Sequence, residues 1–150
     1  MTYLKIGTFL YVLWGVLHIG AGSWLLLTLG AQGTQAVMAQ FGLPSRAALP
    51  DASLGVIGAL AGQHAANLAI LGLFGLVLGI WTMRTRSVFG LWLNVLVIGL
   101  VDIAFLTAFY LPGYVRGVSG LLGPVLFALA ALFTSLGLHT VRGGGSARRG

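Results

Sequence analysis

The stretch GVIGALAGQHAANLAILGLFGLVLGIW, residues 55–81, decides the fold class of this chain. It contains no Asp, Glu, Lys or Arg, and it is longer than the roughly 20 apolar residues that a helix needs to cross the hydrocarbon core of a bilayer. Apolar runs of similar length occupy residues 7–30, 88–111 and 119–141. The sequence therefore predicts an all-α integral membrane protein in which four transmembrane helices form an up-down-up-down bundle.

The composition of the chain agrees with a lipid environment. Of 150 residues, 58% are hydrophobic and 7% are charged, whereas about 25% of the residues of a soluble domain are charged. There is no cysteine, which excludes disulfides, iron–sulfur clusters and thiolate zinc sites. The net charge of +6 arises from eight basic residues that lie between the apolar runs or near the chain ends. This distribution, without a clustered basic face, excludes nucleic acid as a partner.

The basic residues also predict the orientation of the helices. Six of them would flank one side of the membrane and two the other: Lys5, Arg84, Arg86, Arg142, Arg148 and Arg149 against Arg46 and Arg116. Under the positive-inside rule, the side richer in Lys and Arg is cytoplasmic. We therefore expect both termini in the cytoplasm and the protein in a bacterial inner membrane.

The apolar runs predict a single transmembrane domain over residues 1–142 and a short tail after it. Residues 143–150, GGGSARRG, are rich in glycine and basic. Such a composition predicts a flexible tail that is attracted to anionic lipid headgroups.

One sizeable loop, residues 31–54, is predicted outside the membrane. In this loop Val37, Met38 and Phe41 would share one face of a short helix on the membrane surface. A plain connector is the favoured interpretation of the loop.

Small residues gather on one face of the second predicted helix. At about 100° per residue this face carries a nearly continuous groove, here called the small-residue seam. Its members are Gly55, Gly58, Gly62, Ala65, Ala66, Ala69, Gly72 and Gly79. Small residues allow helix backbones to approach closely in a membrane, so we interpret the seam first as a packing surface for a helix of the same chain. This makes the second helix the expected centre of the bundle. The alternative is contact with a second copy or a larger membrane complex through Gly58, Gly62, Ala69 and Gly72.

Polar side chains lie on the opposite face of the same helix, at Gln63, His64 and Asn67. His18 in the first helix and Asp102 in the third would lie at the depth of His64, all within roughly 6 Å of the bilayer centre. A charged group at that depth costs about 2.5–3.5 kcal/mol on insertion scales. We therefore expect Asp102 to face the bundle with a histidine as its partner.

These residues favour the binding of a hydrophobic ligand or cofactor in an electron-transfer membrane complex. His18 and His64 could ligate a b-type haem as axial imidazoles. Gly15 and Gly22, one turn on either side of His18, would leave room for the flat macrocycle. A quinone with a carbonyl group hydrogen-bonded to either histidine uses the same features and requires less strict geometry. The candidate binding residues are His18, His64, Asp102, Gln63, Asn67, Gly15 and Gly22.

An accessory role in a membrane complex ranks beside ligand binding, and two other functions, transport and catalysis, stay open as alternatives. Asp102 and a histidine could relay protons in a small proton-coupled transporter. His18, His64 and Asp102 could instead form a two-histidine, one-carboxylate metal site in an enzyme that acts on a lipid-soluble substrate, so enzymatic activity is left undecided. The chain could also be an accessory subunit of a membrane complex, in which amides such as Asn94 hydrogen-bond between helices.

No family signature is recognised in the sequence. Its layout combines four spans, the outside segment Phe41-Gly42-Leu43-Pro44 and a basic turn after the second span. In outline this layout resembles that of small bacterial DoxX-like membrane proteins. The resemblance implies a similar arrangement of helices and assigns no role to any residue.

Overall fold

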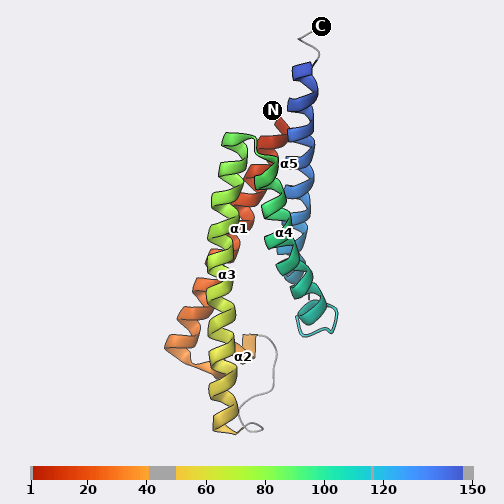
Figure 1. Ribbon diagram of the computed structural model, residues 1–150. Coiled ribbons are helices and arrows are strands. Elements are labelled where there is room, and N and C mark those ends of the chain that lie inside the picture. The colour runs from red at the N-terminus through yellow and green to blue at the C-terminus, as the bar shows by residue number, and fades with distance from the viewer. Residues whose placement is uncertain (1, 41–49, 116, 147–150) are drawn as a thin grey trace.

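The structure is a computed structural model that describes residues 2–40, 50–115 and 117–146 (Figure 1). These residues form helices and turns, and none of them forms a strand. The elements in chain order are α1 (Thr2–Gln32), α2 (Thr34–Gln40), α3 (Asp51–Thr85), α4 (Val88–Phe105), the π-helix η2 (Leu106–Tyr110), the 3-10 helix η3 (Val118–Leu121) and α5 (Leu122–Ser146).

Four helical segments are long and apolar enough to cross a membrane: Thr2–Gln32, Ser53–Thr85, Val88–Tyr110 and Leu122–Thr140. This confirms the prediction of an all-α chain with four candidate transmembrane helices. Many large apolar side chains point outward from these helices, for example Leu27, Phe89 and Leu100, which are 70%, 67% and 62% exposed. An apolar surface of this extent fits a lipid environment.

A short turn connects α3 to α4. Arg86 ends α3 in the left-handed conformation, with φ of 53°. Ser87 then caps α4, because its hydroxyl oxygen accepts a hydrogen bond of 3.1 Å from the backbone N–H of Gly90. The turn brings the end of α3 beside the start of α4, where Gly90 lies against the Thr82 hydroxyl.

The backbones of α1 and α3 touch along the small-residue seam. A Cβ atom added at Gly15 of α1 would lie 2.5 Å from the carbonyl oxygen of Gly72 in α3, and one added at Gly72 would lie 2.6 Å from the carbonyl oxygen of Gly15. Gly22 meets the backbone of Ala65 in the same way. These positions therefore require glycine. The contacts run in opposite order along the two helices, so α1 and α3 are antiparallel.

Two other seam positions are also covered within the chain, whereas Gly55 is exposed and has open space around it. Gly58 contacts Thr34 of α2, and a Cβ atom at Gly62 would lie 3.2 Å from Leu29 of α1. The favoured interpretation, packing against a helix of the same chain, is confirmed. Association with a second copy or a larger complex through the seam is not supported, because Gly58, Gly62, Ala69 and Gly72 already have neighbours in α1 or α2.

The centre of the bundle is α1, and not α3 as expected from the sequence. α1 packs against α3 and also against α5, where Gly137 meets the backbone of Leu4 and Thr134 meets Gly7. Tyr11 of α1 is fully buried in a core cluster with residues of α4 and α5. The small residues of α1 face two different neighbours, so no single seam marked this helix in the sequence.

The predicted outside loop contains the short helix α2, which contacts both α1 and α3. Its Val37 and Met38 are buried. The favoured prediction of a plain connector was therefore wrong for residues 34–40, because the two apolar side chains pack against the long helices. Phe41, the third residue predicted for that face, lies outside the described residues.

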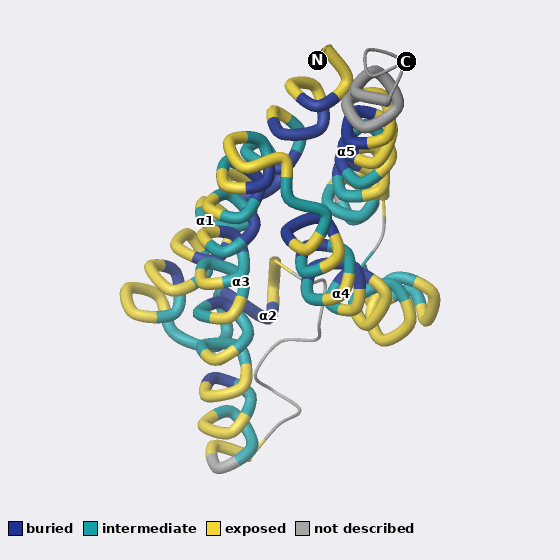
Figure 2. Tube along the Cα trace, turned by 45° about the horizontal axis from the view of Figure 1, so that its top comes forward, coloured by how far each residue is buried: buried dark blue, intermediate teal, exposed yellow. Residues whose placement is uncertain are grey.

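α4 and α5 lie close to α1 and α3 near the end where α1 begins, and they diverge from them toward the other end (Figures 1 and 2). Figure 2 shows that the diverging end of α4 and α5 is mostly half-buried or exposed. α5 continues to Ser146, past the predicted end of the last span at 141. The first part of the predicted flexible tail is therefore helical, and residues 147–150 lie outside the described residues.

Candidate functional site

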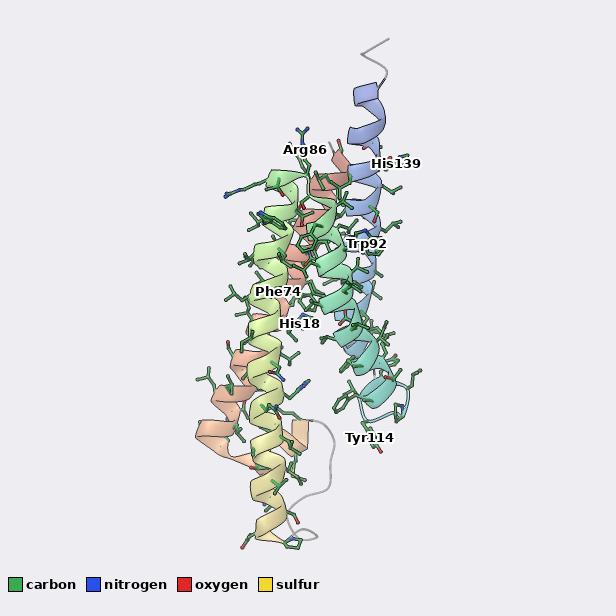
Figure 3. The ribbon with its side chains drawn as sticks, in the orientation of Figure 1. His18, Phe74, Arg86, Trp92, Tyr114 and His139 are labelled. Carbon is green, nitrogen blue, oxygen red and sulfur yellow. The ribbon has the colours of Figure 1, made fainter. Side chains whose placement is uncertain are left out.

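His18 lies about midway along the bundle (Figure 3), and its ring is held by Trp14, one turn earlier on α1. The two rings are stacked, with centroids 3.7 Å apart and planes at 22°. His18 Nδ1 donates a hydrogen bond of 2.8 Å to the carbonyl oxygen of Trp14. Because a carbonyl oxygen only accepts, Nδ1 carries a proton, and in the neutral ring Nε2 carries the lone pair.

Gly123 of α5 faces the edge of this ring pair. A Cβ atom at Gly123 would lie 3.0 Å from His18 Cε1, 3.2 Å from His18 Nε2 and 3.7 Å from Trp14 Nε1. The missing side chain therefore lets α5 pass close beside both ring nitrogens. His18 Nε2 makes no hydrogen bond with the described residues, and it is not among the fully enclosed unpaired atoms. It keeps an accessible surface.

Asp102 of α4 contacts the Trp14 side chain. The residue is 5% exposed, and its carboxyl group interacts with the side chain of Trp14. The contact falls short of standard hydrogen-bond geometry, because Trp14 Nε1 and Asp102 Oδ2 are both buried without a partner. In the described part of the chain Asp102 faces this indole and not a histidine. The expected pairing with a histidine was wrong, because Trp14 takes that position.

His64 of α3 is directed toward a different neighbour. Its ring is tilted by 31° against Phe109, with centroids 5.9 Å apart. Phe109 belongs to the π-helix η2, in which the N–H of Leu111 donates to the carbonyl oxygen of Leu106 at 2.8 Å. The sequence did not predict this π-helix, a form that is frequent at functional sites. His18 and His64 are close enough for their charges to interact, but they face different helices.

The geometry does not favour a haem between the two histidines. Two axial ligands must present their nitrogens to one iron from opposite sides, whereas His18 faces Gly123 and His64 faces Phe109. Gly15 and Gly22 leave no room for a macrocycle, because the backbone of α3 fills the space beside both. The expectation for these two glycines was wrong: their missing side chains serve helix packing.

A metal site built from His18, His64 and Asp102 is not supported either. Within residues 2–40, 50–115 and 117–146, no three His, Asp or Glu side chains gather closely enough to hold a metal ion. Gln63 and Asn67, the amides predicted for the site, are exposed on α3. Of the predicted set, the structure therefore brings His18 and Asp102 together at Trp14, with His64 nearby.

Three further residues belong to the site or adjoin it. Trp14 and Gly123 were missed, although the spacing of four residues between Trp14 and His18 allows their side chains to meet on one helix face. Asn94 of α4 is fully buried, and neither polar atom of its amide has a partner. It lies two turns before Asp102 on the buried face of the same helix. In the sequence it was interpreted only as a packing residue.

Comparison with known proteins adds no assignment. No protein-family model matches the chain, no curated protein is significantly similar to it in sequence, and no solved structure matches its fold.

Proposed function

We propose that this protein binds, beside His18, a lipid-soluble ligand of the quinone class, with an oxygen-bearing ring as its head group. The His18 ring is the observation that carries the proposal. It is half-buried on a membrane-spanning helix, fixed by Trp14, and its Nε2 has no hydrogen bond among the described residues. A fixed imidazole edge at this depth is suited to hydrogen-bond an oxygen atom of a ligand.

Trp14 and Asp102 support the same ligand class. Trp14 Nε1 and Asp102 Oδ2 are buried and face each other without standard hydrogen-bond geometry, and a buried polar atom with no partner at all would cost about 1–3 kcal/mol. A polar head group that reaches these atoms would recover part of that free energy. Phe109, which lies beside His64 and is 42% exposed, offers a stacking surface for a flat ring.

The apolar exterior of the helices favours a ligand with a long apolar tail. Such a tail would lie in the lipid around the bundle, against outward side chains such as Leu100 and Ile103, which are 62% and 57% exposed. A ligand dissolved in the bilayer also reaches the middle of the bundle without leaving the hydrocarbon. This combination fits a quinone better than a water-soluble substrate.

We also propose an up-down-up-down arrangement in the membrane with the start of α1 and the end of α5 in the cytoplasm. Arg86 and His139 lie near that end of the molecule and Tyr114 near the other (Figure 3). This agrees with cytoplasmic cations and with tyrosines at the interfaces. Helical spans fit the bacterial inner membrane, because single-chain proteins that span the outer membrane are β-barrels.

The test of ligand binding is extraction of the protein, purified in mild detergent, followed by mass spectrometry of its quinones. We expect bound ligand of this class in the wild type and about fivefold less in His18→Leu, since a head-group hydroxyl that donates to His18 Nε2 contributes about 1 kcal/mol. His139→Leu is the matched control, because His139 is exposed near the end of α5. A wild type that holds no quinone and takes up no added short-chain ubiquinone would contradict the proposal.

A proton relay is the second candidate function, and Asn94 favours it. Asn94 and Asp102 are both buried on α4, and their unpaired side-chain atoms are of the kind that internal water commonly satisfies. Hydrogen-bonded water conducts protons between such groups. In reconstituted vesicles, Asp102→Asn should abolish proton uptake driven by a membrane potential. Equal uptake by the wild type and Asp102→Asn would exclude a relay through this residue.

A further inference from the structure

The hydrogen bond of His18 restricts what the site offers to a ligand. Nδ1 donates to the carbonyl oxygen of Trp14 at 2.8 Å. Stacking on Trp14 at 3.7 Å between centroids holds the ring in this orientation. The neutral imidazole therefore presents an acceptor, Nε2, and no second donor.

The surroundings of Nε2 leave this acceptor to an incoming group. Gly123 of α5, which has no side chain, lies beside this atom, and a Cβ atom there would lie 3.2 Å from Nε2. No described residue donates a hydrogen bond to Nε2, and this atom is not enclosed. Trp14 Nε1 borders the same face of α5, but it is enclosed and faces the Asp102 carboxyl group. The accessible polar atom at this edge is thus an acceptor, His18 Nε2.

From this arrangement we propose that the site selects ligands whose ring head carries a hydroxyl group, the hydroquinol or phenol class, over ligands whose head carries only carbonyl oxygens. This inference rests on the proposed function and deepens it. A hydroxyl group donates to His18 Nε2, whereas a carbonyl oxygen would set two acceptors against each other.

A competition experiment tests the preference. The full chain is purified in detergent and kept at about pH 8, where an ordinary imidazole is neutral. Under anaerobic conditions it is mixed with equal concentrations of a short-chain ubiquinone and the corresponding hydroquinol. Gel filtration separates the bound ligands, and mass spectrometry counts them. We expect about fivefold more hydroquinol than quinone, the gain from one hydrogen bond. The dimethyl ether of the hydroquinol, which has no donor, should compete no better than the quinone.

The possible failures of this experiment can be told apart. Equal binding of the two forms, or an excess of quinone, would overturn the hydroxyl preference and leave the quinone-class site in place. A dimethyl ether that competes as well as the hydroquinol would also overturn the preference, since it shares the ring and lacks the donor. Binding of neither form would overturn the proposed function itself.

The variant His18→Gln tests whether His18 causes the preference for hydroquinol over quinone. His18→Gln replaces an acceptor by an amide that both donates and accepts, so we expect nearly equal binding of the two forms. His139→Gln should retain the fivefold excess. An excess that persists in folded His18→Gln would overturn the assignment to His18. If gel filtration shows that His18→Gln does not fold, the wild-type competition with the dimethyl ether still decides the preference.

Discussion

The contact between α1 and α3 differs in kind from the packing of α4. Between α1 and α3, backbone meets backbone at Gly15 and Gly72, where even a Cβ atom would come within 2.6 Å of a carbonyl oxygen. α4 instead packs through side chains, carries unpaired buried polar atoms at Asn94 and Asp102, and passes into a π-helix. A backbone contact leaves little freedom to adjust, whereas side chains and unpaired polar atoms can rearrange around a ligand. The bundle thus combines a rigid pair of helices, α1 and α3, with a more adaptable helix, α4.

The largest loss of stability is expected from a large side chain placed in the contact between α1 and α3. Gly72→Leu should destabilise the protein by at least about 3 kcal/mol, because the added atoms meet the α1 backbone and not a flexible side chain. The measurement is the fraction of monodisperse protein after purification and its unfolding midpoint. Gly20→Leu, in α1 with open space around it, is the control and should purify as the wild type does. Normal folding of Gly72→Leu would show that the two backbones are not in contact.

A substitution in α4 should stabilise the protein, in contrast to the destabilising Gly72→Leu. Asn94→Leu removes a buried amide whose polar atoms have no partner, so we expect the free energy of unfolding to rise by about 1 kcal/mol. Chemical unfolding in mixed micelles measures this, with the exposed Asn67→Leu of α3 as the control. A loss of stability would show that the amide of Asn94 is hydrogen-bonded in the membrane, which would favour the proton relay.

The smallest expected change in stability is at Gly62, and it tests how far along α3 the close contact with α1 extends. A Cβ atom at Gly62 would meet only the tip of Leu29, at 3.2 Å. Because that tip can move, Gly62→Ala should change the free energy of unfolding by no more than about 0.5 kcal/mol. Gly72→Ala, measured in the same way, should cost several times more. Similar values for the two variants would mean that the seam is equally tight along its length.

The number of candidate transmembrane helices could be predicted from the sequence, and so could the packing of the seam within the chain. The length of an apolar run is a property of the sequence alone, and small residues recurring on one helix face have few uses other than close approach. The shift of the centre from α3 to α1 could not be predicted, since it depends on which faces meet across the bundle. α1 divides its small residues between two neighbours.

The site was only partly predictable for related reasons. A glycine such as Gly15 removes a side chain, but the sequence does not show whether a ligand or a backbone takes the space. Trp14 is one apolar residue within an apolar run, so nothing distinguished it until its ring was found on His18. The π-helix requires one extra residue in a turn and has no composition of its own. His18 and Asp102 were identified because ionisable groups are rare in a membrane span.

The central position of α1 also affects how the protein is made. α1 leaves the ribosome before α3 and α5, the two helices against which it packs. At roughly 5–20 residues per second, synthesis delivers α5 several seconds or more after α1. During that interval Gly7, and the face of α1 that later meets α5, lie in the bilayer without their neighbour. α5, which is synthesised after α1, therefore completes the environment of α1.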